Sequence, residues 1–332
     1  MRLYQKYCSL IVAFLLFPLE SSQAKIEYLR KEIPARTECT PMRLQSPVLD
    51  ISRKQTDSPW CYAYASADLL SWELQESVSA ADIALLYNDF GNQRLQRDQL
   101  HSEIDKGGNP ARAMEYAMHK GLCLEQNMPS QDFMRVNGTE AVDVKMITMI
   151  ANIESVKRYW DQVSDEKYVC KNTDLIREIF PQLNDLAIGE ILMKTDLFHI
   201  VDSLWEKNCE SKRKFLSKQF DAVEEVSLAQ TREADGIRLL HRLDQLLTLK
   251  KPIGLVVRAP FVGLLEEKGT HAINVIGRRL NSASNECEYL VRDSNASACT
   301  VSYHCDDTGE AWVSESLVQD NLESLFYLRE KK

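Results

Sequence analysis

The sequence predicts an α+β fold of two lobes, in which a helical lobe precedes a lobe of antiparallel β-structure, formed as a sheet or a barrel. Helical spacing with start and stop signals dominates residues 55–130, whereas short β-branched runs between turn residues dominate residues 231–332. Residues 131–230 carry amphipathic helical runs, and we interpret them as a helical insertion between the lobes. A chain of 332 residues with 44% hydrophobic content can bury the core that this architecture needs.

The first 24 residues have the pattern of a secretory signal peptide. Basic residues precede an apolar run at 8–17, and small residues at 22–24 resemble a cleavage site. The apolar run is shorter than the roughly 20 residues that span a bilayer, although a retained anchor is the alternative. No second apolar segment of this kind occurs in the sequence. We therefore expect an exported protein, secreted or periplasmic, with no stable membrane insertion after the signal is removed.

Three helices are predicted after a polar and irregular segment at 25–54, in which 46–51 is the only strand-like patch. We place these helices at residues 61–76, 79–86 and 110–120. Ser79 and Asp82 have the spacing of a capping box for the second helix. A proline opens the third helix and a glycine follows its end, as is typical of helix boundaries.

The last third of the chain turns to β-like patterning after a predicted helix at 234–249. Short apolar runs separated by turn residues then predict a series of strands. These runs lie at residues 252–259, 271–279, 287–294, 298–305 and 309–315. The final stretch at 314–328 has helical spacing and is predicted to close the domain as a helix.

The charge balance excludes several kinds of partner. The chain has 40 basic and 49 acidic residues, a net charge of −9, and no cluster of basic residues. Nucleic acids and anionic membranes attract such clusters, so neither is expected to bind. The sequence also lacks a phosphate-binding glycine-rich loop, and we predict no cofactor.

The nine cysteines fit an oxidising compartment. Cys8 would leave with the signal, and setting Cys61 aside leaves seven, an odd number that predicts at least one further free thiol. Spacing favours local pairs without fixing the connectivity: Cys170 with Cys209, and Cys287 with Cys299 or Cys305. A zinc site is the alternative, although the closely paired spacings of known zinc motifs are absent. Its ligands would be Cys287, Cys299, His304 and Cys305.

Cys61 has the most reactive setting of any residue in the sequence. It opens an alanine-rich helical segment, where unpaired N–H groups and the positive end of the helix dipole favour a thiolate. A cysteine before an apolar helix is often an inert core residue, so this position alone does not predict catalysis. His271 and Asp293, each at the end of a predicted strand, change the interpretation because a thiol, an imidazole and a carboxylate together suit acyl transfer. Gln55, six residues before Cys61, would donate to the oxyanion with the Cys61 N–H.

With these residues in this order, the chain resembles the papain-like cysteine peptidases over residues 45–130 and about 248–330. The family has a Gln six residues before its nucleophilic Cys, an aromatic-Ala-aromatic run after that Cys, a His heading a strand, and an Asn-Ser-Trp segment on the next strand. The resemblance implies a two-lobed fold with the active site in the cleft between the lobes. It also implies that Gly107 and Gly108 form a substrate-binding wall.

The sequence departs from the family pattern at four positions. Asp293 stands where the family has Asn, and its charge would stabilise an imidazolium more strongly. Asn295 stands where the family has a Trp that shields the pair from water. Tyr62 replaces the usual Trp after the nucleophile, and Trp60 fills a position that is usually small. These changes bear on substrate range and efficiency and leave every chemical role represented.

The resulting expectation is an exported cysteine peptidase that hydrolyses peptide bonds through an acyl-enzyme on Cys61. Its partners would be a peptide or protein substrate and a protein inhibitor. One alternative keeps the same three residues in a transglutaminase-like acyl transferase, where an amine replaces water. Another is a catalytically silent papain-like module that binds peptides.

Overall fold

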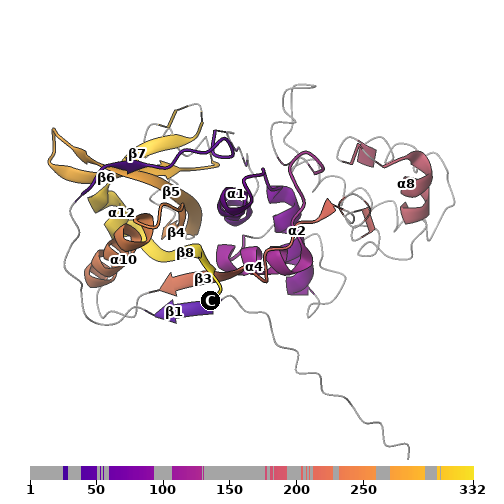
Figure 1. The fold of residues 1–332 in the computed structure, drawn as a ribbon, viewed down its shortest axis with the longest axis horizontal. Coiled ribbons are helices and arrows are strands. Elements are labelled where there is room, and N and C mark those ends of the chain that lie inside the picture. The colour runs from indigo at the N-terminus through magenta and orange to yellow at the C-terminus, as the bar shows by residue number, and fades with distance from the viewer. Residues whose placement is uncertain are drawn as a thin grey trace, which may run out of the picture.

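The computed structural model contains two lobes, one helical and one built on a β-sheet, which pack against each other (Figure 1). It describes residues 25–28, 39–50, 53, 55, 60–92, 107–128, 130, 176–177, 180–181, 183–192, 203–204, 207, 209, 212–226, 232–258, 270–295, 305–306 and 308–332. The predicted signal peptide and the predicted strand at 298–305, except for Cys305, lie outside these residues. The observed class is α+β, as predicted.

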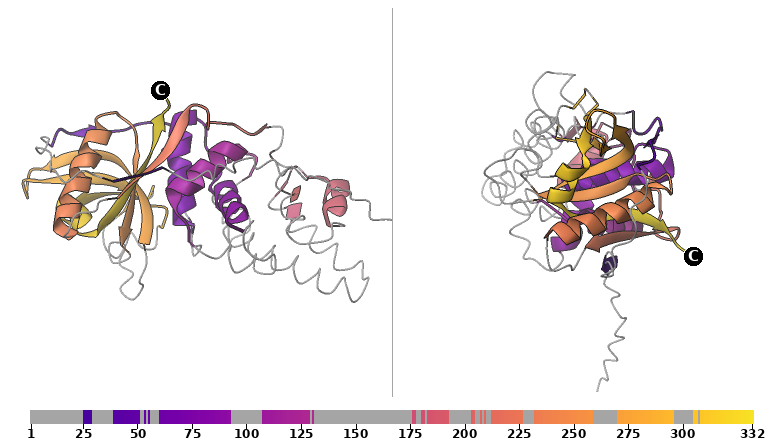
Figure 2. Two further views of the ribbon diagram at one scale, coloured as in Figure 1. Left: turned by 90° about the horizontal axis from the view of Figure 1, so that it is seen from below. Right: turned by 90° about the vertical axis from the view of Figure 1, so that its left-hand side faces the viewer.

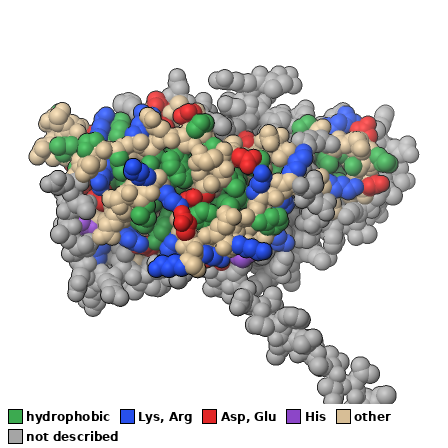
Figure 3. Space-filling view, viewed as in Figure 1, with side chains coloured by type: hydrophobic (Ala, Val, Ile, Leu, Met, Phe, Trp, Pro, Cys, Tyr) green, Lys and Arg blue, Asp and Glu red, His purple; other side chains and the backbone are tan. Residues whose placement is uncertain are grey.

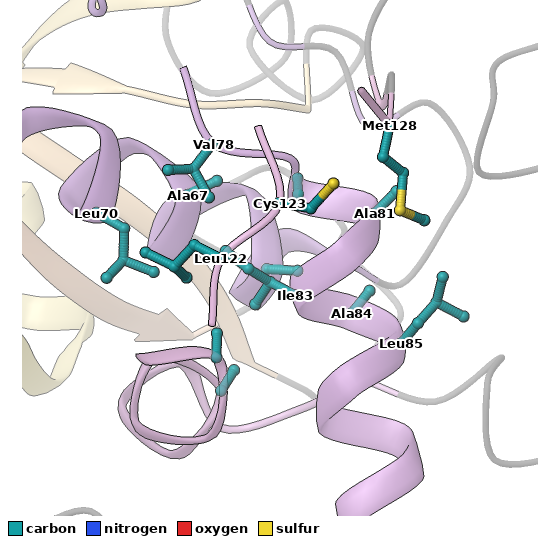
Figure 4. Packing of buried hydrophobic residues seen from close by; sticks show 14 of the residues in the cluster. Ala67, Leu70, Val78, Ala81, Ile83, Ala84, Leu85, Leu122, Cys123 and Met128 are labelled. Atoms are coloured by element: carbon teal, nitrogen blue, oxygen red, sulfur yellow. The ribbon is translucent and has the colours of Figure 1, made fainter. Parts of the chain in front are cut away.

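The helical lobe is built on α1 (Cys61–Leu74), α2 (Ala80–Asn92) and α4 (Pro110–Lys120). These helices confirm the three predicted ones. Figure 4 shows part of their shared core, where Leu70 of α1, Ile83 of α2 and Leu122 converge. Most of α1 is buried, from Tyr62 to Ser71, because it packs on the other helices and also on the sheet. It is therefore the central element of the molecule.

One mixed sheet forms the other lobe, with strand order β1-β3-β8-β4-β5-β6-β7 and β2 paired to β5. The strands are β1 (Lys25–Tyr28), β2 (Met42–Arg43), β3 (Phe220–Val226), β4 (Ile253–Arg258), β5 (Thr270–Asn281), β6 (Glu286–Arg292), β7 (Glu310–Ser314) and β8 (Leu322–Glu330). All the pairs are antiparallel except β1–β3. The described strands form an open path, so the barrel alternative is not supported by any pairing in this part of the chain.

The two faces of the sheet contact different helices. Ala272 and Phe326 pack into the core of the helical lobe, whereas their neighbours Ile273 and Leu325 pack toward α10 (Arg232–Leu247). Side chains alternate between the faces of a strand, so this division puts α1 and α10 on opposite sides. Figure 2 shows the same arrangement, with α12 (Glu315–Asn321) beside α10.

Four sequence predictions were wrong about strands. Residues 220–226, assigned to the helical insertion, form β3. Residues 322–328, predicted as the second half of a final helix, belong to β8, which lies between β3 and β4. The strand-like patch at 46–51 is a turn at its described residues, closed by a hydrogen bond from Leu49 N–H to Ser46 O of 2.9 Å. The N-terminal segment that looked irregular instead supplies β1 and β2.

The insertion between the lobes stays a prediction for most of its length. Within 131–219 the structure describes the helix α8 (Asp185–Leu192), which is capped by Asn184 through the Ala187 N–H at 2.9 Å. Figure 1 shows α8 at the far end of the molecule from the sheet. The rest of this range is described only in short pieces.

The disulfides differ from the local pairs favoured by spacing. Cys39 bonds to Cys287 and Cys123 bonds to Cys209, so neither Cys170–Cys209 nor a bond from Cys287 to Cys299 or Cys305 is formed. Cys305 is also disulfide-bonded. The zinc alternative is therefore wrong, because two of its four ligands have no thiolate to offer. Among the described residues, Cys61 is the free cysteine.

On the face shown in Figure 3, basic and acidic side chains of the described residues are interspersed. Within the same part of the chain, no helix combines the length and the apolar character needed to cross a bilayer.

Candidate active site

Cys61 is the first residue of α1 and is partly exposed. Trp60 precedes it at the N-cap, and the Trp60 carbonyl accepts hydrogen bonds from the Ala63 and Tyr64 N–H groups at 2.8 and 3.1 Å. No acidic residue lies in the first turn. The helix dipole therefore acts on the thiol without an opposing carboxylate in that turn, which favours the thiolate.

His271 and Asp293 meet at neighbouring ends of β5 and β6. His271 is the second residue of β5, and Asp293 directly follows β6, which pairs with β5. His271 Nε2 lies 2.8 Å from Asp293 Oδ1, and both side chains are buried. The Asn295 N–H also donates to Asp293 Oδ1 at 2.8 Å, so the carboxylate is fixed from two sides.

The thiol of Cys61 completes this arrangement. The His271 imidazole and the Ala272 N–H are close enough to the sulfur to lower the pKa of the thiol. Because His271 Nε2 is engaged by Asp293, Nδ1 is the ring nitrogen that serves the thiol. β5 pairs with β6 only from Asn274 onward, so Ala272 has no β6 residue opposite it and its N–H can point to the sulfur.

The electrostatics of the pair favour a thiolate and an imidazolium. Burial alone raises the pKa of Cys61, but the hydrogen bond and charge of His271, together with the Ala272 N–H, outweigh it and lower that pKa. Burial alone lowers the pKa of His271, but the charge and hydrogen bond of Asp293, with a further contribution from Cys61, raise it well above its usual value. Both shifts therefore act in the same direction and favour the charged pair over the neutral thiol and imidazole.

Gln55 is held against the same strand end by two hydrogen bonds to Ser294, the residue after Asp293. The Gln55 N–H donates to Ser294 O at 2.9 Å, and Ser294 Oγ donates to Gln55 Oε1 at 2.7 Å. The amide oxygen accepts from Ser294, and the NH₂ group is the donor end of this side chain. Gln55 is buried, which favours a fixed orientation.

Replacing Gln55 by alanine tests whether this amide is an oxyanion donor. We expect kcat for peptide cleavage to fall about 10²–10³-fold, or about 2.7–4 kcal/mol, because one prepositioned donor is lost. Alkylation of Cys61 by iodoacetamide forms no oxyanion, so its rate is the control and should stay within about twofold of wild type. A kcat within a few-fold of wild type would remove Gln55 from this role.

Gly107 and Gly108 lie in the segment without regular secondary structure that leads into α4. Gly107 is exposed and Gly108 is half-buried. A Cβ atom at Gly108 would stand 2.7 Å from Tyr87 Cε1 and 2.9 Å from Tyr62 Cε2, which is too close for any other residue without rearrangement. Tyr62 follows Cys61 directly, so the glycine pair lies near the start of α1, while its role as a substrate wall stays a prediction.

Two features of the site were not predicted from the sequence. Ser294 holds Gln55, and its position in Asp-Ser-Asn was the only available clue. Gly309 accepts a hydrogen bond from the Asp293 N–H at 2.9 Å and has a φ of 81°. A Cβ there would lie 2.4 Å from Asp293 O, so a glycine is needed to keep Asp293 in place.

Several solved structures are similar to this chain in fold. In structure it is similar to papain-like cysteine proteases. A digestive procathepsin L 3 from the larval midgut of Tenebrio molitor has a TM-score of 0.45 and 9% identity, over 92% of this chain and 75% of that one. Bromelain from Ananas comosus, in complex with the E64 inhibitor, has a TM-score of 0.39 and 12% identity, over 87% of this chain and 95% of bromelain. A cysteine protease of Carica candamarcensis in complex with E-64 has a TM-score of 0.40 and 11% identity, over 85% of this chain and 93% of that protease.

Similarity at this level is distant. No protein-family model matches the chain, and no curated protein matches it in sequence. Because the TM-scores are below 0.5, the functional interpretation rests on the geometry of Cys61, His271 and Asp293.

Proposed function

We propose that this protein is a cysteine peptidase in which Cys61 is the nucleophile, His271 the general base and acid, and Asp293 the orienting carboxylate. One observation carries the proposal: the free thiol at the start of α1 lies against an imidazole whose other nitrogen is 2.8 Å from a buried carboxylate. This constellation matches the roles that acyl transfer through a thiol requires. The residues come from both lobes, so the site lies where α1 meets the sheet.

In the first half of the reaction, Cys61 Sγ attacks the carbonyl carbon of the scissile peptide bond and forms a C–S bond. The carbonyl oxygen becomes an oxyanion, which the Gln55 NH₂ and the Cys61 N–H would stabilise. The His271 imidazolium then gives its Nδ1 proton to the leaving nitrogen, and the C–N bond breaks. An acyl-enzyme and a free amine result.

In the second half, water gives a proton to His271 Nδ1 while its oxygen attacks the acyl carbon. The C–S bond breaks, the carboxylic product leaves, and the thiolate and imidazolium are restored. Asp293 keeps its hydrogen bond to Nε2 throughout, which fixes the tautomer and holds Nδ1 toward the sulfur. Its negative charge favours the imidazolium at both stages.

An extended peptide or protein substrate would lie across the start of α1, beside Gly107 and Gly108. The glycines would allow close approach of a substrate backbone for strand-like hydrogen bonding. A protein inhibitor that presents an extended segment would use the same surface. The two described disulfides are typical of an oxidising compartment, which supports the proposal that the protein is exported.

The direct test is reaction of the purified protein with the epoxide E-64, which is bound by the bromelain and Carica proteases named above. We expect a single modification, located at Cys61 by mass spectrometry, at a pH below that at which ordinary thiols ionise. Peptide cleavage should be lost in proportion to the modified fraction. Absence of modification, or equal modification of several cysteines, would contradict the proposal.

The same preparation separates hydrolysis from acyl transfer. A glutamine-containing peptide is incubated with and without a primary amine, and the products are identified by mass spectrometry. Cleaved peptide in both reactions fits the peptidase. Amine-linked product without cleavage would favour the transglutaminase-like alternative, because the amine would then be replacing water.

A further inference from the structure

Asp68 is a buried carboxylate on α1 at the junction of the two lobes, with 4% of its surface exposed. It lies seven residues after Cys61, which is close to two helical turns. It therefore faces the same side of the helix, roughly 10 Å further along the axis. Nothing in the proposed reaction uses this carboxylate directly.

The groups that bind Asp68 come from the segments that carry the other site residues. Arg292, which directly precedes Asp293, has its Nε 2.8 Å from Asp68 Oδ2. Arg53, two residues before Gln55, has its Nε 2.7 Å from Asp68 Oδ1 as an ion pair rather than an aligned hydrogen bond. Asn274, three residues after His271, donates from Nδ2 to Asp68 Oδ2 at 3.4 Å.

These partners are themselves fixed by further hydrogen bonds. Arg292 Nη1 donates to Leu49 O, and Arg53 Nη2 donates to the hydroxyls of Ser71 and Ser77 at 3.2 and 3.3 Å. Asn274 Nδ2 also donates to Ala65 O of α1 at 3.0 Å. The contacts are directional, unlike the apolar packing around them, and so can define how β5 and β6 are oriented on α1.

We propose that Asp68 is a positioning residue that holds the thiol of Cys61 against the His271–Asp293 pair. The inference rests on the proposed function and adds a part to it. Three segments, carrying Gln55, His271 and Asp293, meet on this one carboxylate, which belongs to the helix that begins with Cys61. The alternative is that Asp68 serves stability alone, although buried ion pairs commonly stabilise no better than apolar side chains of similar volume.

Removing the charge of Asp68 separates a positional effect from an electrostatic one. Loss of a negative charge at this distance would by itself favour the Cys61 thiolate, and so increase its reactivity at acidic pH. Loosening the contact between the thiol and His271 would have the opposite effect, because that contact favours the thiolate. A contribution to stability alone would leave the reactivity of the folded protein unchanged.

The experiment compares Asp68→Asn with Asp244→Asn in the full chain. Asp244 forms a matched buried pair with Arg278, at 2.8 Å and with side chains 8% and 5% exposed, between α10 and β5. It also accepts a hydrogen bond from Tyr289 at 3.1 Å, and it lies on the face of the sheet away from α1. The rate of Cys61 alkylation by iodoacetamide is measured from pH 5 to 9, and circular dichroism shows that each variant is folded at the assay temperature.

We expect Asp68→Asn to lower the alkylation rate at pH 6 about tenfold or more, the effect of raising the thiol pKa by about one unit. Asp244→Asn should stay within about twofold of wild type. If Asp68→Asn does not fold, Arg292→Lys replaces it; lysine keeps the charge but cannot bind both Asp68 and Leu49 O as the guanidinium does. It should lower the rate about threefold or more.

Two results would overturn the inference, and they differ in what they mean for the proposed function. In the first, the wild-type thiol is reactive, and the folded Asp68→Asn variant, or Arg292→Lys, is equally or more reactive. Asp68 would then have no positioning role, and the peptidase proposal would stand. A wild-type thiol with ordinary reactivity at pH 6 would overturn the proposed function and this inference together.

Discussion

Replacement of Cys61 by alanine should reduce peptide cleavage on the order of 10⁶-fold, to the level left by the binding groups alone. The reason is chemical, because no other group at the site can form the covalent bond to the acyl carbon. The substitution removes only the sulfur atom of a partly exposed side chain, so the melting temperature should change by only a few degrees. Initial rates on a peptide substrate and a thermal melt measure both effects.

The same variant separates the peptidase from a binding module. Cys61→Ala should still bind the peptide substrate with a Kd close to that of wild type, because the surface beside Gly107 and Gly108 is unchanged. Cys61→Ser is the matched variant, and it should also be inactive because a serine hydroxyl ionises far less readily than a thiol. Cleavage retained in either variant, or a wild type that binds peptides without cleaving them, would contradict the peptidase proposal.

Replacement of His271 by alanine should remove the unusual reactivity of Cys61 as well as peptide cleavage. In wild type, His271 lowers the pKa of the thiol against the opposing effect of burial. Without the imidazole, burial dominates and the pKa rises. At a pH below the thiol pKa of both wild type and variant, the thiolate fraction falls about tenfold for each unit by which that pKa rises. We therefore expect the variant to need a higher pH than wild type to reach the same E-64 labelling rate. At pH 6 its labelling rate should be about a hundredfold or more below that of wild type.

His241 provides the control for this variant. It is also a buried histidine, but it lies on α10, on the other face of the sheet. His241→Ala should lower stability while leaving the labelling profile of Cys61 where it is in wild type. If the His271→Ala variant instead labels like wild type, the thiol is not paired with the imidazole and the proposed mechanism is wrong.

The elements that were predicted correctly are those whose local pattern agrees with their surroundings. Helix α4 has a proline in its first turn, Asn109 as its cap and Gly121 at its end. β5 and β6 consist of apolar runs between turns. Only half of the expected capping box forms: Ser79 Oγ accepts from the Asp82 N–H at 3.0 Å, but the Asp82 carboxylate instead accepts from the Cys123 N–H.

The strands that were missed have sequences whose environment is set by distant residues. β3 looks like a charged surface segment, yet Glu224 accepts from Asn109 and Ser324, and Glu225 pairs with Arg242. β8 is buried on both faces, and a short apolar run of that kind has no period that separates strand from helix. The Cys39–Cys287 disulfide joins residues 248 positions apart, which spacing alone does not reveal.

The order of Gln55, Cys61, His271 and Asp293 was enough to name the candidate site, and the structure brings the last three into contact. Their catalytic roles stay predictions. The bond between Ser294 and Gln55 and the convergence on Asp68 were not predicted, because both depend on how segments far apart in the chain pack together.

The position of α1 also has a consequence for how the protein denatures. Its buried side chains belong to one continuous apolar cluster that includes Ala272, Phe326 and Leu328 from the sheet. A lobe melts independently only if its core is separate, and here the helical lobe shares its core with β5 and β8. Heat or denaturant should therefore disrupt both lobes in one cooperative transition, with no intermediate in which the sheet persists after the helices have melted.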